Sequence, residues 1–124
     1  MSDLLHGVVV AHGKVASALV GAAEQITGTR GALTPVSNTD CDRGALEARV
    51  EEASAGRRAV VFVDLAAGSC LIAVLRNLRE NPDVRVVTGV NLAMLVDFLF
   101  HLELSPEEAA ARAETSGLRA IRRP

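Results

Sequence analysis

Short apolar runs alternate with amphipathic segments along the chain, and the two patterns differ in period. Runs rich in Val at residues 7–11, 59–64 and 84–89 are short and β-branched, which is typical of buried strands in a parallel sheet. The segment Leu33–Val36 predicts a further strand, and Pro35 places it at an edge because proline cannot donate to the ladder. The pattern therefore predicts four strands separated by helices.

The segments between these strands carry apolar residues at the three- and four-residue spacing of helices that bury one face. The predicted buried stripes are Val15, Leu19, Ala22, Ala23 and Ile26 in the first helix; Leu46, Val50 and Ala53 in the second; Leu71, Ile72, Leu75 and Leu78 in the third; and Leu92, Leu95, Val96 and Leu99 in the fourth.

Polar residues predict where the later helices begin and end. Ser69 is a suitable cap for the third helix, and Asn91 opens the fourth. A fifth helix is predicted to start at Ser105-Pro106, because a capping serine, a proline and a later glutamate form a strong start signal. We expect this helix to end at residues 115–117, and Leu118–Arg122 to form one more edge strand.

This alternation of strand and helix predicts an α/β fold. Three layers are expected, with a mostly parallel sheet, right-handed crossovers and helices on both faces. The common strand order 2-1-3-4 would make the first and third strands neighbours. A length of 124 residues is that of one globular domain, which we expect to span residues 1–124.

Composition excludes several classes of function. The net charge is −2, and the chain has three Phe but no Tyr or Trp, so neither a nucleic-acid surface nor an anionic membrane surface is expected. The first residues lack the basic start and long apolar run of a signal peptide. Apolar segments fall short of the roughly 20 residues of a membrane-spanning helix. We therefore expect a cytoplasmic protein.

Cysteine and histidine are too sparse to predict a metal centre or a disulfide framework. Cys41 and Cys70 are far apart in sequence, and both are expected to be free thiols, with Cys70 a small buried residue rather than a reactive one. His6 and His101 are expected to be structural or exposed. The predicted site therefore includes no metal and no cofactor.

Candidate chemistry lies at the carboxyl ends of the predicted strands, where open α/β sheets bind ligands. His12 follows the first strand, Asp64 ends the third, and Asn91 follows the fourth. A carboxylate that accepts from one imidazole nitrogen leaves the other as a nucleophile, and it stabilises the ring once that ring is positive. Position alone leaves phosphate chemistry, metal binding and a simple buried hydrogen bond all open.

Phosphoryl oxygens need donors, and helix N-termini supply free N–H groups. Gly13 stands before the first helix, and Gly68-Ser69 stands at the third, so these three are the predicted phosphate-binding residues. A receiver-like domain phosphorylated on Asp64 is an alternative. It is disfavoured because residues 11–14 (AHGK) lack the acidic cluster that would hold magnesium.

Three segments in this order resemble the enzyme IIA domain of the mannose family of the bacterial phosphoenolpyruvate-dependent sugar phosphotransferase system (PTS). They are residues 8–13 (VVVAHG), 61–65 (VFVDL) followed by Gly68-Ser69, and 88–92 (TGVNL). The resemblance implies that His12 is phosphorylated on the ring nitrogen farther from the backbone. It also implies that Asp64 bonds the nearer nitrogen and that Ser69 lines the phosphate site.

The same resemblance implies partners and assembly. The histidine phosphocarrier protein would be the donor, and a IIB protein of a sugar permease would be the acceptor, which allows peripheral association with a membrane permease. Leu118–Arg122 would be a strand exchanged between the subunits of a homodimer.

The sequence departs from the family pattern after Asp64, where Ala67 stands in place of a glycine and Cys70 in place of a proline. This departure motivates an alternative function. The chain would then be a regulatory protein whose phosphorylation state on His12 controls binding to a partner, without sugar transport.

Overall fold

A computed structural model describes residues 4–78 and 81–124, and within them four parallel strands form one sheet in the order β2-β1-β3-β4. This confirms the predicted fold class and strand order. The elements are β1 (His6–Ala11), α1 (Val15–Thr27), β2 (Leu33–Ser37), α2 (Arg43–Ser54), β3 (Ala59–Val63), α3 (Ser69–Leu78), β4 (Val84–Thr88), α4 (Leu92–Leu99) and α5 (Pro106–Arg119). The predicted domain 1–124 and the expected lack of a signal peptide both involve residues 1–3, which lie outside the described residues.

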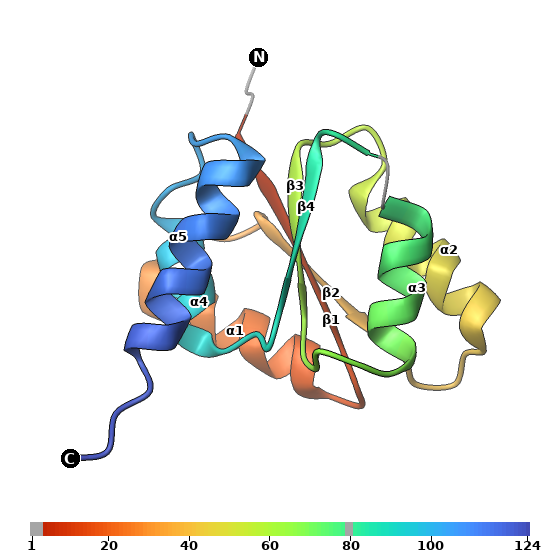
Figure 1. The fold of residues 1–124 in the computed structure, drawn as a ribbon, viewed down its shortest axis with the longest axis horizontal. Helices are drawn as coiled ribbons and strands as arrows, with labels where there is room; N and C mark the ends of the chain where they lie inside the picture. Colours follow the sequence, from red (N-terminus) through yellow and green to blue (C-terminus); the bar gives the residue numbers. More distant parts are fainter. Residues whose placement is uncertain (1–3, 79–80) are drawn as a thin grey trace.

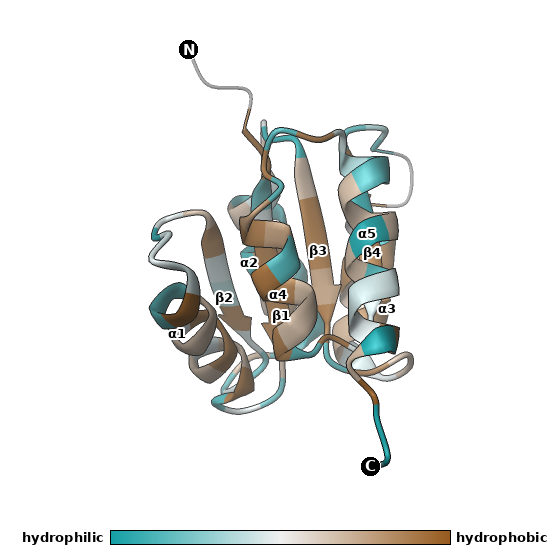
Figure 2. Cartoon of the chain, turned by 90° about the vertical axis from the view of Figure 1, so that its left-hand side faces the viewer, coloured by the Kyte–Doolittle hydropathy of each residue, from teal (hydrophilic) through white to brown (hydrophobic). Residues whose placement is uncertain are grey.

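Helices cover both faces of the sheet, as Figure 1 shows, with α1, α4 and α5 on one side and α2 and α3 on the other. Side chains alternate between the two faces along each strand. Val9 and Phe62 therefore pack with Leu95 and Phe98 in one apolar cluster. Val8 belongs to a second apolar cluster, on the opposite face of the sheet, which α2 and α3 cover. The brown strands of Figure 2 mark this buried layer. In the described part of the chain, no helix has the length and apolar character needed to cross a bilayer.

Strand register brings the candidate residues to one edge of the sheet. Val10 of β1 pairs with Val63 of β3, and Ala11 pairs with Ser37 of β2. The residues that follow these strands therefore leave the sheet side by side. Because all strands are parallel, this edge is the carboxyl end where α/β proteins place their sites.

Two predicted helix starts are confirmed. The side chain of Asn91 accepts from the backbone N–H of Met94 at the start of α4. Ser105 and Glu108 form a reciprocal capping box at the start of α5, which satisfies two N–H groups that have no partner within the helix.

The predicted end of the last helix is wrong. Helix α5 continues through residues 115–117 to Arg119, because the small Gly117 is buried against Met94 and nothing there breaks the helix. Leu118 and Arg119 are helical and residues 121–124 have no regular structure, so the expected edge strand 118–122 does not form within one chain. Its exchange between subunits stays a prediction.

The predicted buried faces of α1 and α3 are correct at Ala23 and Leu78 but otherwise displaced by about one residue. Helix α3 buries Cys70, Ala73, Val74 and Leu78, while Ile72 and Leu75 are exposed. Helix α1 buries Ala16, Val20 and Ala23, while Val15 and Ile26 are exposed. Small residues let each helix approach the sheet closely, and the larger apolar side chains then lie at the margin of the contact.

Candidate functional site

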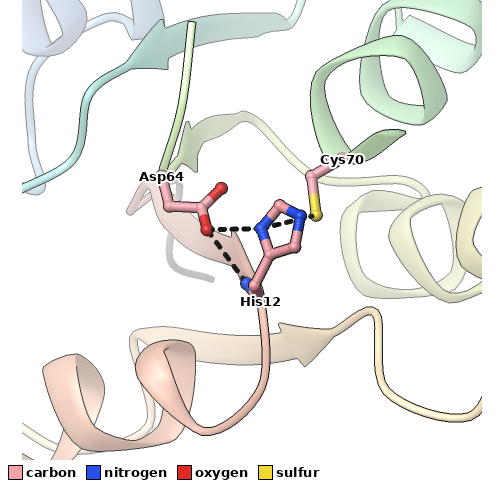
Figure 3. A group of neighbouring side chains, drawn as sticks. All are labelled: His12, Asp64 and Cys70. Carbon is pink, nitrogen blue, oxygen red and sulfur yellow. Dashed lines mark hydrogen bonds and ion pairs between the residues drawn. The ribbon is translucent and has the colours of Figure 1, made fainter. Parts of the chain in front are cut away.

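His12 and Asp64 meet at the carboxyl edge of the sheet, where β1 and β3 end. The Nδ1 atom of His12 lies 2.7 Å from Oδ2 of Asp64, and the backbone N–H of His12 donates to the same oxygen over 3.0 Å (Figure 3). An ionised carboxylate only accepts hydrogen bonds, so Nδ1 carries the ring proton. The other ring nitrogen, Nε2, then holds the free lone pair.

Burial and hydrogen bonding act on Asp64 in opposite directions. Burial alone would raise the pKa of its carboxyl group, but the hydrogen bonds from the ring and backbone of His12, the charge of that ring and the backbone N–H of Leu65 together lower it. Asp64 is therefore ionised at neutral pH. Its side chain is 15% exposed while that of His12 is 44% exposed, so the carboxylate lies behind a ring that solvent and partners can reach.

Gly13 forms the turn that leads from His12 into α1. Its φ of +56° lies in the left-handed region that favours glycine. The end of β2 holds this turn: the N–H of Gly13 donates to Oδ1 of Asn38 over 3.3 Å, and its carbonyl accepts from Oγ of Ser37 over 2.7 Å. Neither Ser37 nor Asn38 is among the predicted site residues. Their position at the end of a strand neighbouring the first was the signal that would have found them.

Gly68 and Ser69 form the start of α3, beside the same edge. Gly68 has a φ of +101°, again in the glycine-favoured region, and both residues are exposed. The first N–H groups of a helix have no partner within it. This end of α3 therefore presents free donors and the positive end of a helix dipole.

Cys70, in the first turn of α3, lies next to the ring of His12. Its Sγ lies 3.8 Å from Nδ1 of His12, and the residue is fully buried. Burial, followed by the charges of Asp64 and Cys41, raises the pKa of the thiol to about 11. Its burial agrees with the predicted packing role, and its Sγ also lies against the ring of His12. One donor atom each from His12, Asp64 and Cys70 lies within 4.8 Å of the others.

Asn91 does not belong to this group, although it too follows a strand. Its Oδ1 accepts from Met94 at the start of α4, and its Nδ2 donates to the carbonyl of Gly117 over 3.2 Å. Both polar atoms are thus used to join α4 to α5. The other two histidines are also structural: Nε2 of His6 lies 2.6 Å from Oγ1 of Thr34, and Nδ1 of His101 lies 2.8 Å from the carbonyl of Asp97.

Comparison with known proteins gives one family. The family EIIA-man, described as PTS system fructose IIA component, matches residues 7–114. This range contains His12, Asp64 and the start of α3. No curated protein matched the sequence.

Solved structures with the same fold include three PTS proteins. A phosphotransferase system component EIIA from Streptococcus agalactiae has a TM-score of 0.88 and 17% identity, with 97% of each chain covered. The mannose/sorbose-specific IIA subunit from Enterococcus faecalis has a TM-score of 0.85 and 20% identity, with 98% of this chain and 95% of that chain covered. A PTS IIA protein associated with the fucose utilization operon of Streptococcus pneumoniae has a TM-score of 0.76 and 23% identity, with 93% and 92% covered.

Proposed function

Because the chain belongs to the EIIA-man family of PTS fructose IIA components, we propose that it is a phosphocarrier that accepts a phosphoryl group on Nε2 of His12. Membership makes the chain a component of the sugar phosphotransferase system. One observation supports the finer proposal above all others: the hydrogen bond of 2.7 Å from Nδ1 of His12 to Asp64 leaves the opposite, accessible side of the ring as the nucleophile.

In the proposed transfer, the lone pair of Nε2 attacks the phosphorus atom carried by the donor. A nitrogen–phosphorus bond forms on His12 as the bond to the donor breaks, and the donor keeps that electron pair. The ring of His12 becomes positive while Nδ1 keeps its proton. Asp64, held ionised 2.7 Å away, stabilises this charge and fixes the ring orientation.

The phosphoryl oxygens would be received by Gly13, Gly68 and Ser69. Gly68 and Ser69 offer the free N–H groups at the start of α3, and Ser69 adds a hydroxyl. The N–H of Gly13 now donates to Asn38 through a long bond of 3.3 Å. A phosphoryl oxygen is a stronger acceptor than an amide oxygen, so we propose that it replaces Asn38 as the partner of Gly13.

The proposed partners are the histidine phosphocarrier protein as donor and a IIB protein of a sugar permease as acceptor. These partners would place the chain in the cytoplasm, in peripheral association with the permease. We also propose a homodimer formed through the C-terminal segment. Leu118 and Ile121 support it, since they are 63% and 73% exposed in the single chain and would gain from burial against a second subunit.

The test is the intact mass after incubation with phosphoenolpyruvate, enzyme I and the histidine phosphocarrier protein. We expect one acid-labile phosphoryl group on the wild type, none on His12→Ala and one on the matched control His101→Ala. Addition of a IIB protein should then discharge the wild type. A phosphorylated chain that no IIB protein discharges, and whose affinity for another protein changes, would favour the regulatory alternative. No phosphoryl group on the wild type would overturn the proposal.

A further inference from the structure

We propose that His12, Asp64 and Cys70 form a binding site for a thiophilic divalent cation of the Zn²⁺ class, and that the bound ion prevents phosphorylation of His12. The metal site stands on the geometry of these three side chains. Its regulatory consequence rests on the proposed phosphocarrier function. Figure 3 shows the three side chains converging from the ends of β1 and β3 and from the start of α3.

The donor atoms already lie close to the spacing that a tetrahedral ion needs. Zinc bonds of about 2.0 Å to nitrogen and oxygen and about 2.3 Å to sulfur place neighbouring donors roughly 3.3–3.6 Å apart. Nδ1 of His12 lies 2.7 Å from Oδ2 of Asp64 and 3.8 Å from Sγ of Cys70. The widest of the three separations lies within 4.8 Å, so ion binding requires the donors to close by up to about 1.2 Å, which rotations of the Asp64 and Cys70 side chains would supply.

The chemistry of the three donors selects the ion. Imidazole and thiolate are ligands of zinc and related metals, whereas Mg²⁺ and Ca²⁺ prefer oxygen. Three protein ligands leave a fourth tetrahedral position, which a water molecule would occupy. Cys70 is decisive, because without its sulfur only one nitrogen and one carboxylate remain.

Proton placement explains why this ion would block phosphorylation. A neutral imidazole carries one proton, which the hydrogen bond to Asp64 keeps on Nδ1. An ion bound to Nδ1 uses the lone pair there, so the ring proton moves to Nε2. The thiol proton of Cys70 passes to the buffer as the metal–sulfur bond forms. Nε2 then has no free lone pair with which to attack phosphorus, and Asp64 is no longer available to the ring.

Titration with Zn²⁺ in competition with a chromophoric chelator tests the site without any phosphotransfer. We expect one ion per wild-type chain. Removal of the ligand in Cys70→Ala should weaken binding at least about 100-fold, since loss of groups that merely support a ligand costs about 10–100-fold. Cys41→Ala is the matched control and should bind like the wild type. Cys70→Ser, which keeps the size of the side chain, provides a second variant if the alanine variant unfolds.

Cobalt provides a direct view of the sulfur. The wild type and Cys41→Ala should show the thiolate-to-cobalt charge-transfer absorption in the near ultraviolet when Co²⁺ is added, and both Cys70 variants should lack it. Equal zinc affinity in the wild type and the Cys70 variants, or no such absorption in the wild type, would overturn the site.

Phosphorylation measured with and without equimolar Zn²⁺ tests the consequence separately. We expect the ion to suppress phosphoryl transfer to the wild type. In Cys70→Ala, the rate with Zn²⁺ should be close to the rate without it. Order of addition distinguishes an effect on this chain from an effect on the donor proteins. Zinc binding without phosphorylation in the metal-free protein would overturn the phosphocarrier function but keep the site. Binding with undiminished phosphorylation would overturn the inhibition.

Discussion

A single oxygen of Asp64, Oδ2, accepts two hydrogen bonds from His12, one from the backbone N–H over 3.0 Å and one from Nδ1 over 2.7 Å. The carboxylate therefore fixes both the turn and the ring. Asp64→Asn keeps the shape of the side chain but removes the negative charge that would stabilise the ring after transfer. We expect the rate of phosphorylation to fall by about 100-fold or more, the range of a lost general acid–base or orienting group.

Rapid-quench sampling followed by intact mass would measure this rate. Asp83→Asn, an exposed change beside β4 at the opposite end of the sheet, is the matched control and should leave the rate unchanged. Equal rates for the wild type and Asp64→Asn would show that the carboxylate does not orient or stabilise His12.

His6 should make folding stability depend on pH. It is 8% exposed, and burial together with the charge of Arg57 lowers its pKa from 6.5 to about 4. Between these two values the unfolded chain binds more protons than the folded chain, so stability falls as pH falls from 6.5 towards 4. At pH 5 this linkage removes about 2 kcal/mol relative to pH 7.

Urea unfolding of the wild type and His6→Gln at pH 7 and pH 5 isolates this effect. Glutamine still offers an N–H to Thr34 but does not titrate, and His12 and His101 are common to both proteins. The wild type should lose about 2 kcal/mol more than the variant on acidification. Parallel losses would contradict a buried, neutral His6.

Two glycines in helices should respond oppositely to alanine. A Cβ at Gly117 in α5 would lie 2.4 Å from Cε and 2.7 Å from Cγ of Met94, whereas a Cβ at Gly21 in α1 meets nothing within 4 Å. Gly117→Ala should lower the free energy of unfolding by about 1–3 kcal/mol through overpacking. Gly21→Ala should raise it by about 0.5–1 kcal/mol. Denaturant unfolding measures both, and a stabilised Gly117→Ala would show that the Met94 side chain moves aside at little cost.

The proposed dimer should depend on the C-terminal segment. Ile121→Ser removes an apolar side chain that is 73% exposed in the single chain and that we propose to be buried between subunits. We expect the dimer dissociation constant to rise by about tenfold or more, from the loss of roughly 1.5 kcal/mol or more of apolar burial. Sedimentation velocity across a concentration series measures it.

Ile26→Ser, at the 59% exposed isoleucine of α1, is the matched control and should leave the dissociation constant unchanged. A wild type that is monomeric throughout the series would contradict the dimer. A dimer that neither substitution weakens would place the interface elsewhere.

The strands were predictable because their signal is local. The runs that became β1, β3 and β4 are rich in Val, and the parallel order puts His12 and Asp64 together once β1 and β3 are neighbours. Capping at Ser105 was equally predictable, since both partners of the box lie within one turn. In each case the residues that decide the structure are close in sequence, or belong to strands whose pairing follows from the topology.

Helix faces and side-chain partners were less predictable because they depend on the shape of distant surfaces. Hydrophobicity alone predicted that Ile72 and Leu75 would be buried. In the structure the smaller Cys70 and Ala73 are buried instead, and Ile72 and Leu75 are exposed. Asn91, like Asp64, is a polar residue that follows a strand. Its side chain, however, hydrogen-bonds to backbone groups of α4 and α5 and not to the site. The contact of Cys70 with His12 depends on where α3 meets the sheet, which no local pattern encodes.

The site residues His12 and Asp64 are 52 positions apart in sequence. They meet only when β3 has paired with β1, which requires α1, β2 and α2 to be accommodated in between. A nascent chain that stops short of β3 can form the first helix and still have no orienting carboxylate. Fraying of exposed ends would spare the site, whereas separation of the two central strands would abolish it. Phosphorylation of His12 would thus require that β1 and β3 are paired, so only chains with an intact central sheet would be phosphorylated.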